Sequence, residues 1–141
     1  MRNKKVFFFI ILMSYLLLVY NCNKSPTESN VENLVNRLWT LESFIINGNI
    51  INPPDIQIYN VQFKENGRFS RVNDCNDFGG EYEIKSDNLI IIRAGGSEAN
   101  CPNSMYREYF EAFKSVKSYK IINNILNIYY GTNSALIFYR E

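Results

Sequence analysis

The chain has 141 residues, with 15 Lys and Arg side chains against 14 Asp and Glu, three cysteines and no histidine. The lack of histidine excludes Ser/His and Cys/His nucleophile pairs and the usual zinc ligand sets. The near-neutral charge gives no reason to expect nucleic acid or an anionic membrane surface as a partner.

The N-terminus has the layout of a secretory signal. Three basic residues precede a largely apolar run, Val6–Tyr20, and a polar segment begins at Asn21. A membrane-spanning helix needs roughly 20 apolar residues, and this run of 15 is shorter. We therefore predict a signal peptide over residues 1–21, with an uncleaved membrane anchor as the alternative.

Cys22 directly follows the apolar run. The segment Leu18–Cys22 resembles a lipobox, so we expect cleavage before Cys22 and its lipidation; a free thiol is the alternative. Lipidation would account for the odd cysteine and leave Cys75 and Cys101 to form a disulfide in an oxidising compartment. Residues 22–36 would then hold the lipidated cysteine and a flexible polar tether, ahead of a single domain over residues 37–141.

Short strands separated by turn signals follow the tether. Asn47-Gly48 is a typical hairpin turn, and Glu65–Arg68 is a second turn. In the segment 56–64 the set Gln57, Tyr59, Val61 and Phe63 is the more apolar, so we expect it to face the core. The predicted strands cover 38–46, 56–64, 69–72, 81–85, 88–93, 119–122, 125–130 and 135–140.

One segment departs from the β pattern. Tyr106, Tyr109, Phe110, Phe113 and Val116 recur at spacings of three and four, which predicts one face of an amphipathic helix. Asn103 or Ser104 is the expected N-cap. About eight short strands with one inserted helix predict a mainly β (α+β) fold, a curled antiparallel sheet or cracked β-barrel, with the helix over one mouth or open edge.

The segment from Asp74 to Tyr82 reads C-N-x-F-x-G-x-Y, and its fixed positions are Cys75, Asn76, Phe78, Gly80 and Tyr82. This pattern resembles the META domain (HslJ-like) family. The resemblance extends over roughly residues 37–140 and includes Trp39 with Leu41, Phe63 with Gly67–Ser70, and Ser97–Cys101. Arg71 and Asp74 stand where the family often has glycine, so we expect a more charged loop before Cys75.

The motif is interpreted as a determinant of the fold. We expect Gly79-Gly80 to form a sharp turn with positive φ, Asn76 to hydrogen-bond nearby backbone, and Phe78 and Tyr82 to fill the core. The acidic residues Asp74, Asp77, Glu81 and Glu83 do not match the spacing of an EF-hand calcium loop.

These observations favour a non-catalytic, lipid-anchored bacterial envelope protein. The resemblance implies a binding or stress-tolerance module of the periplasm or outer membrane, a monomer without a cofactor, whose ligand is an envelope protein or a small apolar molecule. The alternative is an inhibitor or regulator of an envelope enzyme that acts through the disulfide-braced loop 74–80. We expect no enzymatic activity and no metal site.

Overall fold

In the computed structural model, the described residues are 31–55, 58–71, 76–86, 88–97, 99 and 102–140. The signal peptide, Cys22 and most of the tether lie outside them. Residues 31–34, which lie within the predicted flexible tether, form a short helical turn instead. No helix in the described part of the chain is long and apolar enough to span a membrane.

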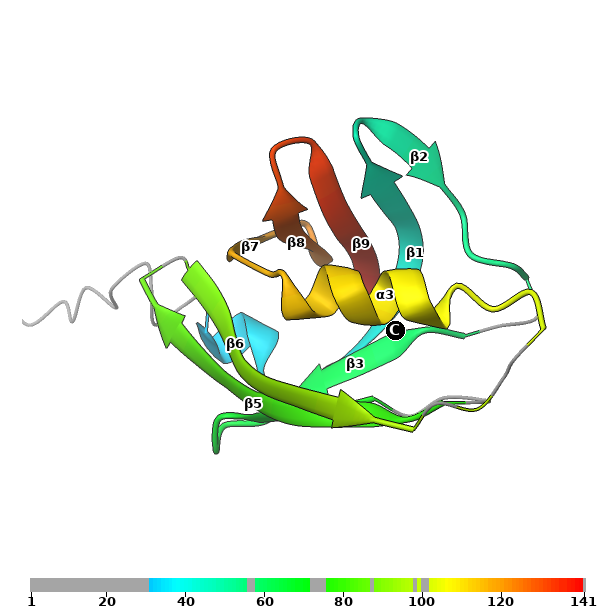
Figure 1. Ribbon diagram of the computed structural model, residues 1–141. Coiled ribbons are helices and arrows are strands. Elements are labelled where there is room, and N and C mark those ends of the chain that lie inside the picture. Colours follow the sequence, from blue (N-terminus) through cyan, green and yellow to red (C-terminus); the bar gives the residue numbers. More distant parts are fainter. Residues whose placement is uncertain are drawn as a thin grey trace, which may run out of the picture.

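A single antiparallel sheet forms the body of the domain (Figure 1). Along its main path the strand order is β6-β5-β4-β3-β1-β9-β8-β7, and β2 pairs with β1 beside this path. The strands are β1 (Leu38–Ile46), β2 (Asn49–Ile51), β3 (Asn60–Phe63), β4 (Arg68–Ser70), β5 (Phe78–Lys85), β6 (Asn88–Gly96), β7 (Ser118–Ile122), β8 (Ile125–Gly131) and β9 (Ser134–Arg140).

The sheet curls because several of its strand pairs are irregular. Register shifts interrupt the β1–β9, β5–β6 and β8–β9 pairs, and such bulges increase the local twist of a sheet. The helix α3 (Tyr106–Lys114) connects β6 to β7, the two ends of the strand path, and crosses the open side between them (Figure 1). The predicted curled sheet with one covering helix is therefore confirmed.

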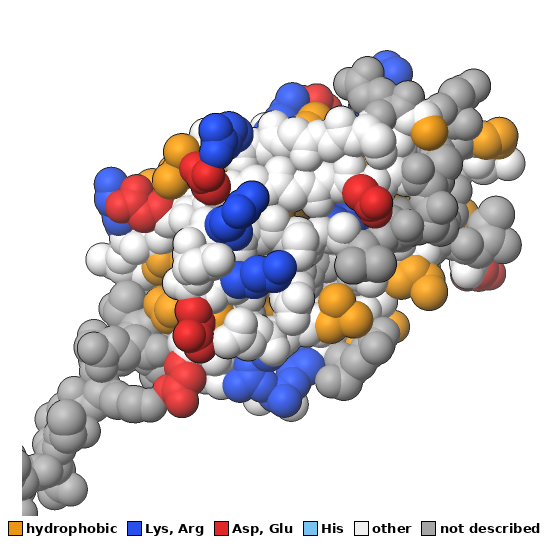
Figure 2. Space-filling model, turned by 90° about the horizontal axis from the view of Figure 1, so that it is seen from below, with side chains coloured by type: hydrophobic (Ala, Val, Ile, Leu, Met, Phe, Trp, Pro, Cys, Tyr) orange, Lys and Arg blue, Asp and Glu red, His pale blue; other side chains and the backbone are white. Residues whose placement is uncertain are grey.

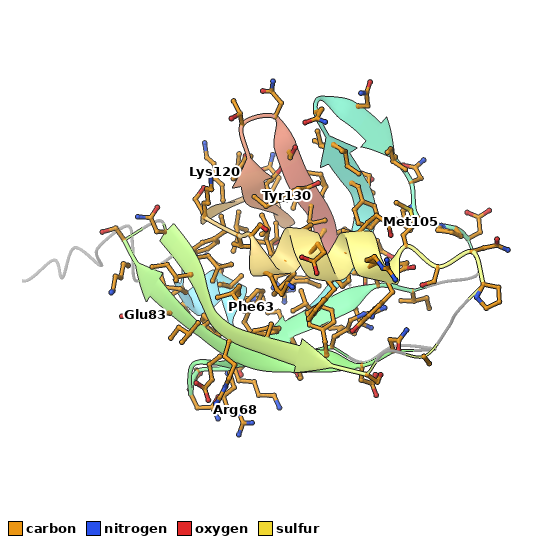
Figure 3. All side chains as sticks on the ribbon, in the orientation of Figure 1. Phe63, Arg68, Glu83, Met105, Lys120 and Tyr130 are labelled. Atoms are coloured by element: carbon orange, nitrogen blue, oxygen red, sulfur yellow. The ribbon has the colours of Figure 1, made fainter. Side chains whose placement is uncertain are left out.

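Aromatic side chains fill the concave side of the sheet. Phe63 lies between α3 and the lower strands, stacked on Phe113 of the helix with ring centroids 6.0 Å apart (Figure 3). Tyr109 of α3 is fully buried and meets Phe44 and Tyr59 edge to face. The prediction that one set of residues in the segment 56–64 faces the core is confirmed for its described members, since Tyr59, Val61 and Phe63 are all buried.

The Asn47-Gly48 turn follows its sequence signal, and the start of the helix requires a correction. Asn47 and Gly48 both have positive φ, as a tight hairpin requires. The N-cap of α3 is Met105, not Asn103 or Ser104. Ser104 still contributes, because its Oγ accepts a hydrogen bond from the backbone N–H of Tyr106 at 3.1 Å.

Candidate functional site

Asn76 joins two segments that are far apart in the sequence. Its side-chain Oδ1 accepts the backbone N–H of Ala99 at 2.6 Å, and its Nδ2 donates to the carbonyl oxygen of Ala99 at 3.0 Å. The Oγ of Ser97 also donates to Asn76 Oδ1, at 3.2 Å. The side chain is almost completely buried. Asn76 thus extends the β5–β6 pairing by an amide link across 23 residues of sequence.

The other described motif residues also face the interior. Phe78 is 3% exposed and packs edge to face on Phe113 of α3. Tyr82 is buried too, and its hydroxyl donates to the carbonyl oxygen of Lys64 at 2.7 Å. Burial raises the pKa of the Tyr82 hydroxyl, and the nearby Glu65 raises it further. Both rings fill the core, as expected.

The expectation of a Gly79-Gly80 turn is wrong. Both glycines lie inside β5, and among the described glycines only Gly48 and Gly67 have positive φ. Gly80 is needed for space instead. A Cβ atom there would overlap the carbonyl oxygen of Arg93 on β6 and would lie 2.8 Å from the carbonyl carbon of Arg93.

The loop 74–80 therefore differs from the expected exposed loop. Residues 78–80 are part of a strand, and Asn76 and Phe78 are buried, so Asp77 is the one exposed side chain among its described residues. Residues 74 and 75 lie outside the described part of the chain. All three cysteines, Cys22, Cys75 and Cys101, also lie outside it, so their lipidation and pairing stay predictions.

Arg71 is buried, contrary to the expected charged loop at this point. Only 3% of its side chain is exposed, and its guanidinium carbon lies 4.8 Å from the ring centroid of Tyr59 and 5.2 Å from that of Tyr109. Its Nη1 donates to the carbonyl oxygen of Asn76 at 2.8 Å. Cation–π contacts of this kind offset part of the desolvation of a buried cation. Arg71 thereby connects the aromatic core to the Asn76 link.

A shallow trough lies on the opposite, outer side of the strands β4, β5 and β6. It has a volume of about 810 Å³. In the register of these strands, Ser70 opposes Gly79 and Gly79 opposes Gly95, so the centre of the trough carries almost no side chains. One step along the strands, Arg68 opposes Glu81 and Glu81 opposes Arg93. This register places a charged rim beside a flat glycine floor.

The rim carries more basic than acidic groups. Glu81 and Arg93 form an ion pair with each other. Lys64 and Arg68 also line the trough, and neither forms an ion pair with another described residue. Arg68 points outward, away from the helix side of the sheet (Figure 3), and Lys and Arg side chains gather near the middle of the face seen from below (Figure 2).

Two of the acidic residues of the segment 74–83 form ion pairs with basic side chains, and Asp74 lies outside the described part of the chain. Glu81 pairs with Arg93, and Glu83 pairs with Lys85 at 3.3 Å. No group of three or more potential ligand residues comes together among the residues that the structure describes. The trough was not predicted from the sequence. Its signal in the sequence is that Asp77, Gly79 and Glu81 alternate with the buried motif residues and must face outward.

The comparisons with known proteins agree on the fold. The profile of the META domain family matches residues 32–141. An NMR structure of a protein from Burkholderia xenovorans superposes with a TM-score of 0.64 at 18% identity, covering 78% of this chain and 85% of that one. The crystal structure of a DUF4847 family protein from Bacteroides vulgatus gives 0.60 at 17% identity, covering 77% and 94%. No curated protein matches the chain.

Proposed function

Because this chain belongs to the META domain family, we propose that it is a non-catalytic binding module of the bacterial cell envelope, held at the membrane by a lipid on Cys22. The predicted secretory signal over residues 1–21 and the lipobox-like Leu18–Cys22 segment support the envelope location and the lipid anchor. The partner is a protein of the periplasm or outer membrane.

The observation that carries the binding role is the trough on the outer face of β4–β6. A floor formed by Gly79 and Gly95 lets a partner approach the backbone closely. Lys64 and Arg68 on its rim favour a partner segment that presents acidic side chains. We therefore place the partner on this face.

The inside of the curled sheet offers less support for a small apolar ligand. Trp39, Phe63, Tyr109, Phe113 and Phe138 are each no more than 1% exposed and occupy the concave side. The rings of Phe63, Phe113, Tyr109 and Phe138 contact each other in succession, with a centroid distance of 5.8 Å between Tyr109 and Phe113. Binding at the outer face leaves this packing undisturbed, and binding inside would require several rings to move.

The second candidate function is regulation of an envelope enzyme through the same face. Asp77 lines the trough, is exposed, and is held by paired backbone contacts with Ser97: its N–H donates to Ser97 Oγ at 3.1 Å, and its carbonyl oxygen accepts from Ser97 N at 2.9 Å. A carboxylate carried on an anchored backbone beside a flat floor is suited to entering a partner's cleft.

Site-specific crosslinking in cells tests the binding role. A photoreactive residue at Ser70, in the trough, is compared with one at Asn127, on β8 outside it. We expect a crosslinked envelope protein from position 70 only, and its loss when Arg68→Glu is added. Equal crosslinking from both positions, or none from position 70, would contradict the proposal. Regulation predicts that the captured partner is an enzyme whose turnover the chain slows, and that Asp77→Asn relieves the effect.

The predicted signal cleavage and lipid anchor are tested separately, by the intact mass of the protein isolated from membranes. We expect a chain that begins at Cys22 and carries a diacylglyceryl group. Cys22→Ser should leave a precursor that lacks this added mass. A second measurement after alkylation, with and without reductant, reports the Cys75–Cys101 disulfide. A soluble chain with an unmodified Cys22 would refute the anchor without touching the trough.

A further inference from the structure

Arg37 and Arg140 line the same pocket at one end of the sheet. The β1–β2 hairpin turn lies at the other end of β1. Arg140 on β9 is paired directly with Trp39 on β1, and Arg37 precedes Trp39 by two residues. The turn Asn123-Asn124, between β7 and β8, closes the same end. A pocket of about 200 Å³ lies here, and its lining includes Asn33, Arg37, Trp39, Asn123, Asn124 and Arg140.

The guanidinium groups of this pocket have unused donors. Arg37 Nη2 donates to Asn33 Oδ1 at 3.3 Å, but Arg37 Nε is enclosed and has no acceptor within the described part of the chain. Arg140 is exposed and forms no ion pair with a described residue. A buried N–H without an acceptor is costly. No acidic side chain is among the described residues that line this pocket.

A larger pocket of about 620 Å³ adjoins the first, because Arg37 and Arg140 line both. Val31 and Val35 give it apolar walls. Glu32 and Glu65 line it as well, and Glu65 accepts a hydrogen bond from Asn36 Nδ2 at 2.8 Å. The two pockets together therefore combine a basic, amide-rich end with a partly apolar end.

We propose that the smaller pocket binds a phosphate group between Arg37 and Arg140, and that the larger pocket takes the apolar part of a molecule carrying that group. The planar guanidinium fork matches phosphate oxygens in bidentate geometry, and the Asn123 and Asn124 amides add neutral donors. The pocket volume of about 200 Å³ is several times the roughly 30 Å³ that one water molecule occupies in the liquid, so a phosphate fits.

The position of the site makes a lipid headgroup one source of that phosphate. Val31, on the wall of the larger pocket, is the first described residue that follows Cys22 in the chain. Residues 22–30 span on the order of 30 Å when fully extended, so a chain anchored at Cys22 keeps this end of the domain close to the bilayer. Free inorganic phosphate offers the same oxygens, and the experiment separates the two sources.

Trp39 is the sole tryptophan of the chain and lines the pocket, so its fluorescence reports binding. The full chain is reconstituted in vesicles of digalactosyldiacylglycerol, a lipid that carries no phosphate, and titrated with inorganic phosphate, with chloride at matched ionic strength as the reference. A second set of vesicles also contains phosphatidylglycerol. The variants are Arg37→Gln and Arg140→Gln, and Lys120→Gln on β7, outside the pocket lining, is the matched charge control.

We expect a saturable change in Trp39 emission with phosphate and none with chloride. Each arginine variant should weaken binding by roughly tenfold or more, since a charged hydrogen-bonded group is lost, and Lys120→Gln should bind normally. Phosphatidylglycerol should produce the same change and remove the response to added phosphate. An undiminished phosphate response in those vesicles would refute the headgroup source and assign the site to free phosphate.

The melting temperature gives a second measurement that does not depend on the indole. Phosphate should raise it in the parent chain and in Lys120→Gln, by linkage of binding to folding, and should not raise it in the arginine variants. No saturable emission change together with no rise in melting temperature, or equal responses in parent and arginine variants, would overturn the site.

Discussion

The close approach of β5 and β6 at Gly80 can be tested by adding one methyl group. In Gly80→Ala the new Cβ would overlap the carbonyl oxygen of Arg93 and would lie 2.8 Å from its carbon and 3.0 Å from Ala94 Cα. These are backbone atoms, so no side chain can rotate away. The strands must separate at the Gly80–Ala94 pair, beside the bulge at Glu81 and Tyr82.

Overpacking of a well-packed site costs about 1–3 kcal/mol and occasionally more. Since only backbone can move here, we expect Gly80→Ala to lower the free energy of unfolding by about 3 kcal/mol. Gly95→Ala is the matched control, because a Cβ there meets no atom within 4 Å. Its backbone does not have positive φ, so alanine should be neutral or stabilise the domain by up to about 1 kcal/mol.

Urea denaturation followed by Trp39 fluorescence measures both variants under the same conditions. The midpoint should fall for Gly80→Ala with an unchanged slope, which indicates that the unfolded state is unaffected. The reasoning would be refuted if Gly80→Ala changed the free energy of unfolding by less than about 0.5 kcal/mol, the range of ordinary surface substitutions. Equal destabilisation by both alanines would refute it as well.

Asn76→Asp should destabilise the domain by about 2 kcal/mol or more in urea denaturation, because it replaces the donor to the Ala99 carbonyl with an acceptor, and the exposed Asn127→Asp should not. Arg71→Lys should cost about 1–2 kcal/mol in the same assay, since an ammonium group lacks the planar face that lies against Tyr59 and Tyr109; an equal loss in the exposed Arg68→Lys would contradict this. Burial raises the pKa of Tyr109 above its ordinary value of 10.0, so its contribution to stability is complete below pH 10 and declines as the pH rises further. Melting curves above pH 10 should therefore show less alkaline destabilisation in Tyr109→Phe than in the parent, and an equal loss in both would contradict this.

Local signals in the sequence predicted most of the elements. Asn47-Gly48 marks the hairpin because both residues accept positive φ, and the aromatic spacing of 106–116 marks α3 because it repeats over more than two turns. The predicted bounds of β1, Leu38–Ile46, are those of the structure. Strand β2 was missed, because its three residues are all exposed and show no alternation.

The errors concern features that depend on distant residues. Phe78 begins β5 because its backbone pairs with Gly96, and nothing next to it in the sequence indicates this. Arg71 is buried because Tyr59, which precedes β3, and Tyr106 and Tyr109 of α3 surround its guanidinium. A charged residue beside glycines and aspartates reads as exposed when only its neighbours are considered. Long-range pairing therefore decided both cases.

The register of β5 gives the family motif a physical meaning. Asn76, Phe78, Gly80 and Tyr82 are separated by two residues, so they share one face. Asn76, Phe78 and Tyr82 are buried on that face, and Gly80 is partly buried against β6. Asp77, Gly79 and Glu81 occupy the alternate face and line the trough. The motif thus fixes the inner surface of the strand and leaves the outer surface free to vary without loss of the fold.

This division separates effects on stability from effects on binding. Substitutions at Asn76, Phe78, Gly80 or Tyr82 should change the free energy of unfolding, and any loss of binding should follow from it. Asp77→Asn and Glu81→Gln should leave unfolding within about 0.5 kcal/mol of the parent, because both side chains are solvent-accessible. If they still alter the crosslinking pattern from Ser70, the outer face of β5 carries the specificity. If the pattern follows only the inner-face variants, the trough is not the binding surface.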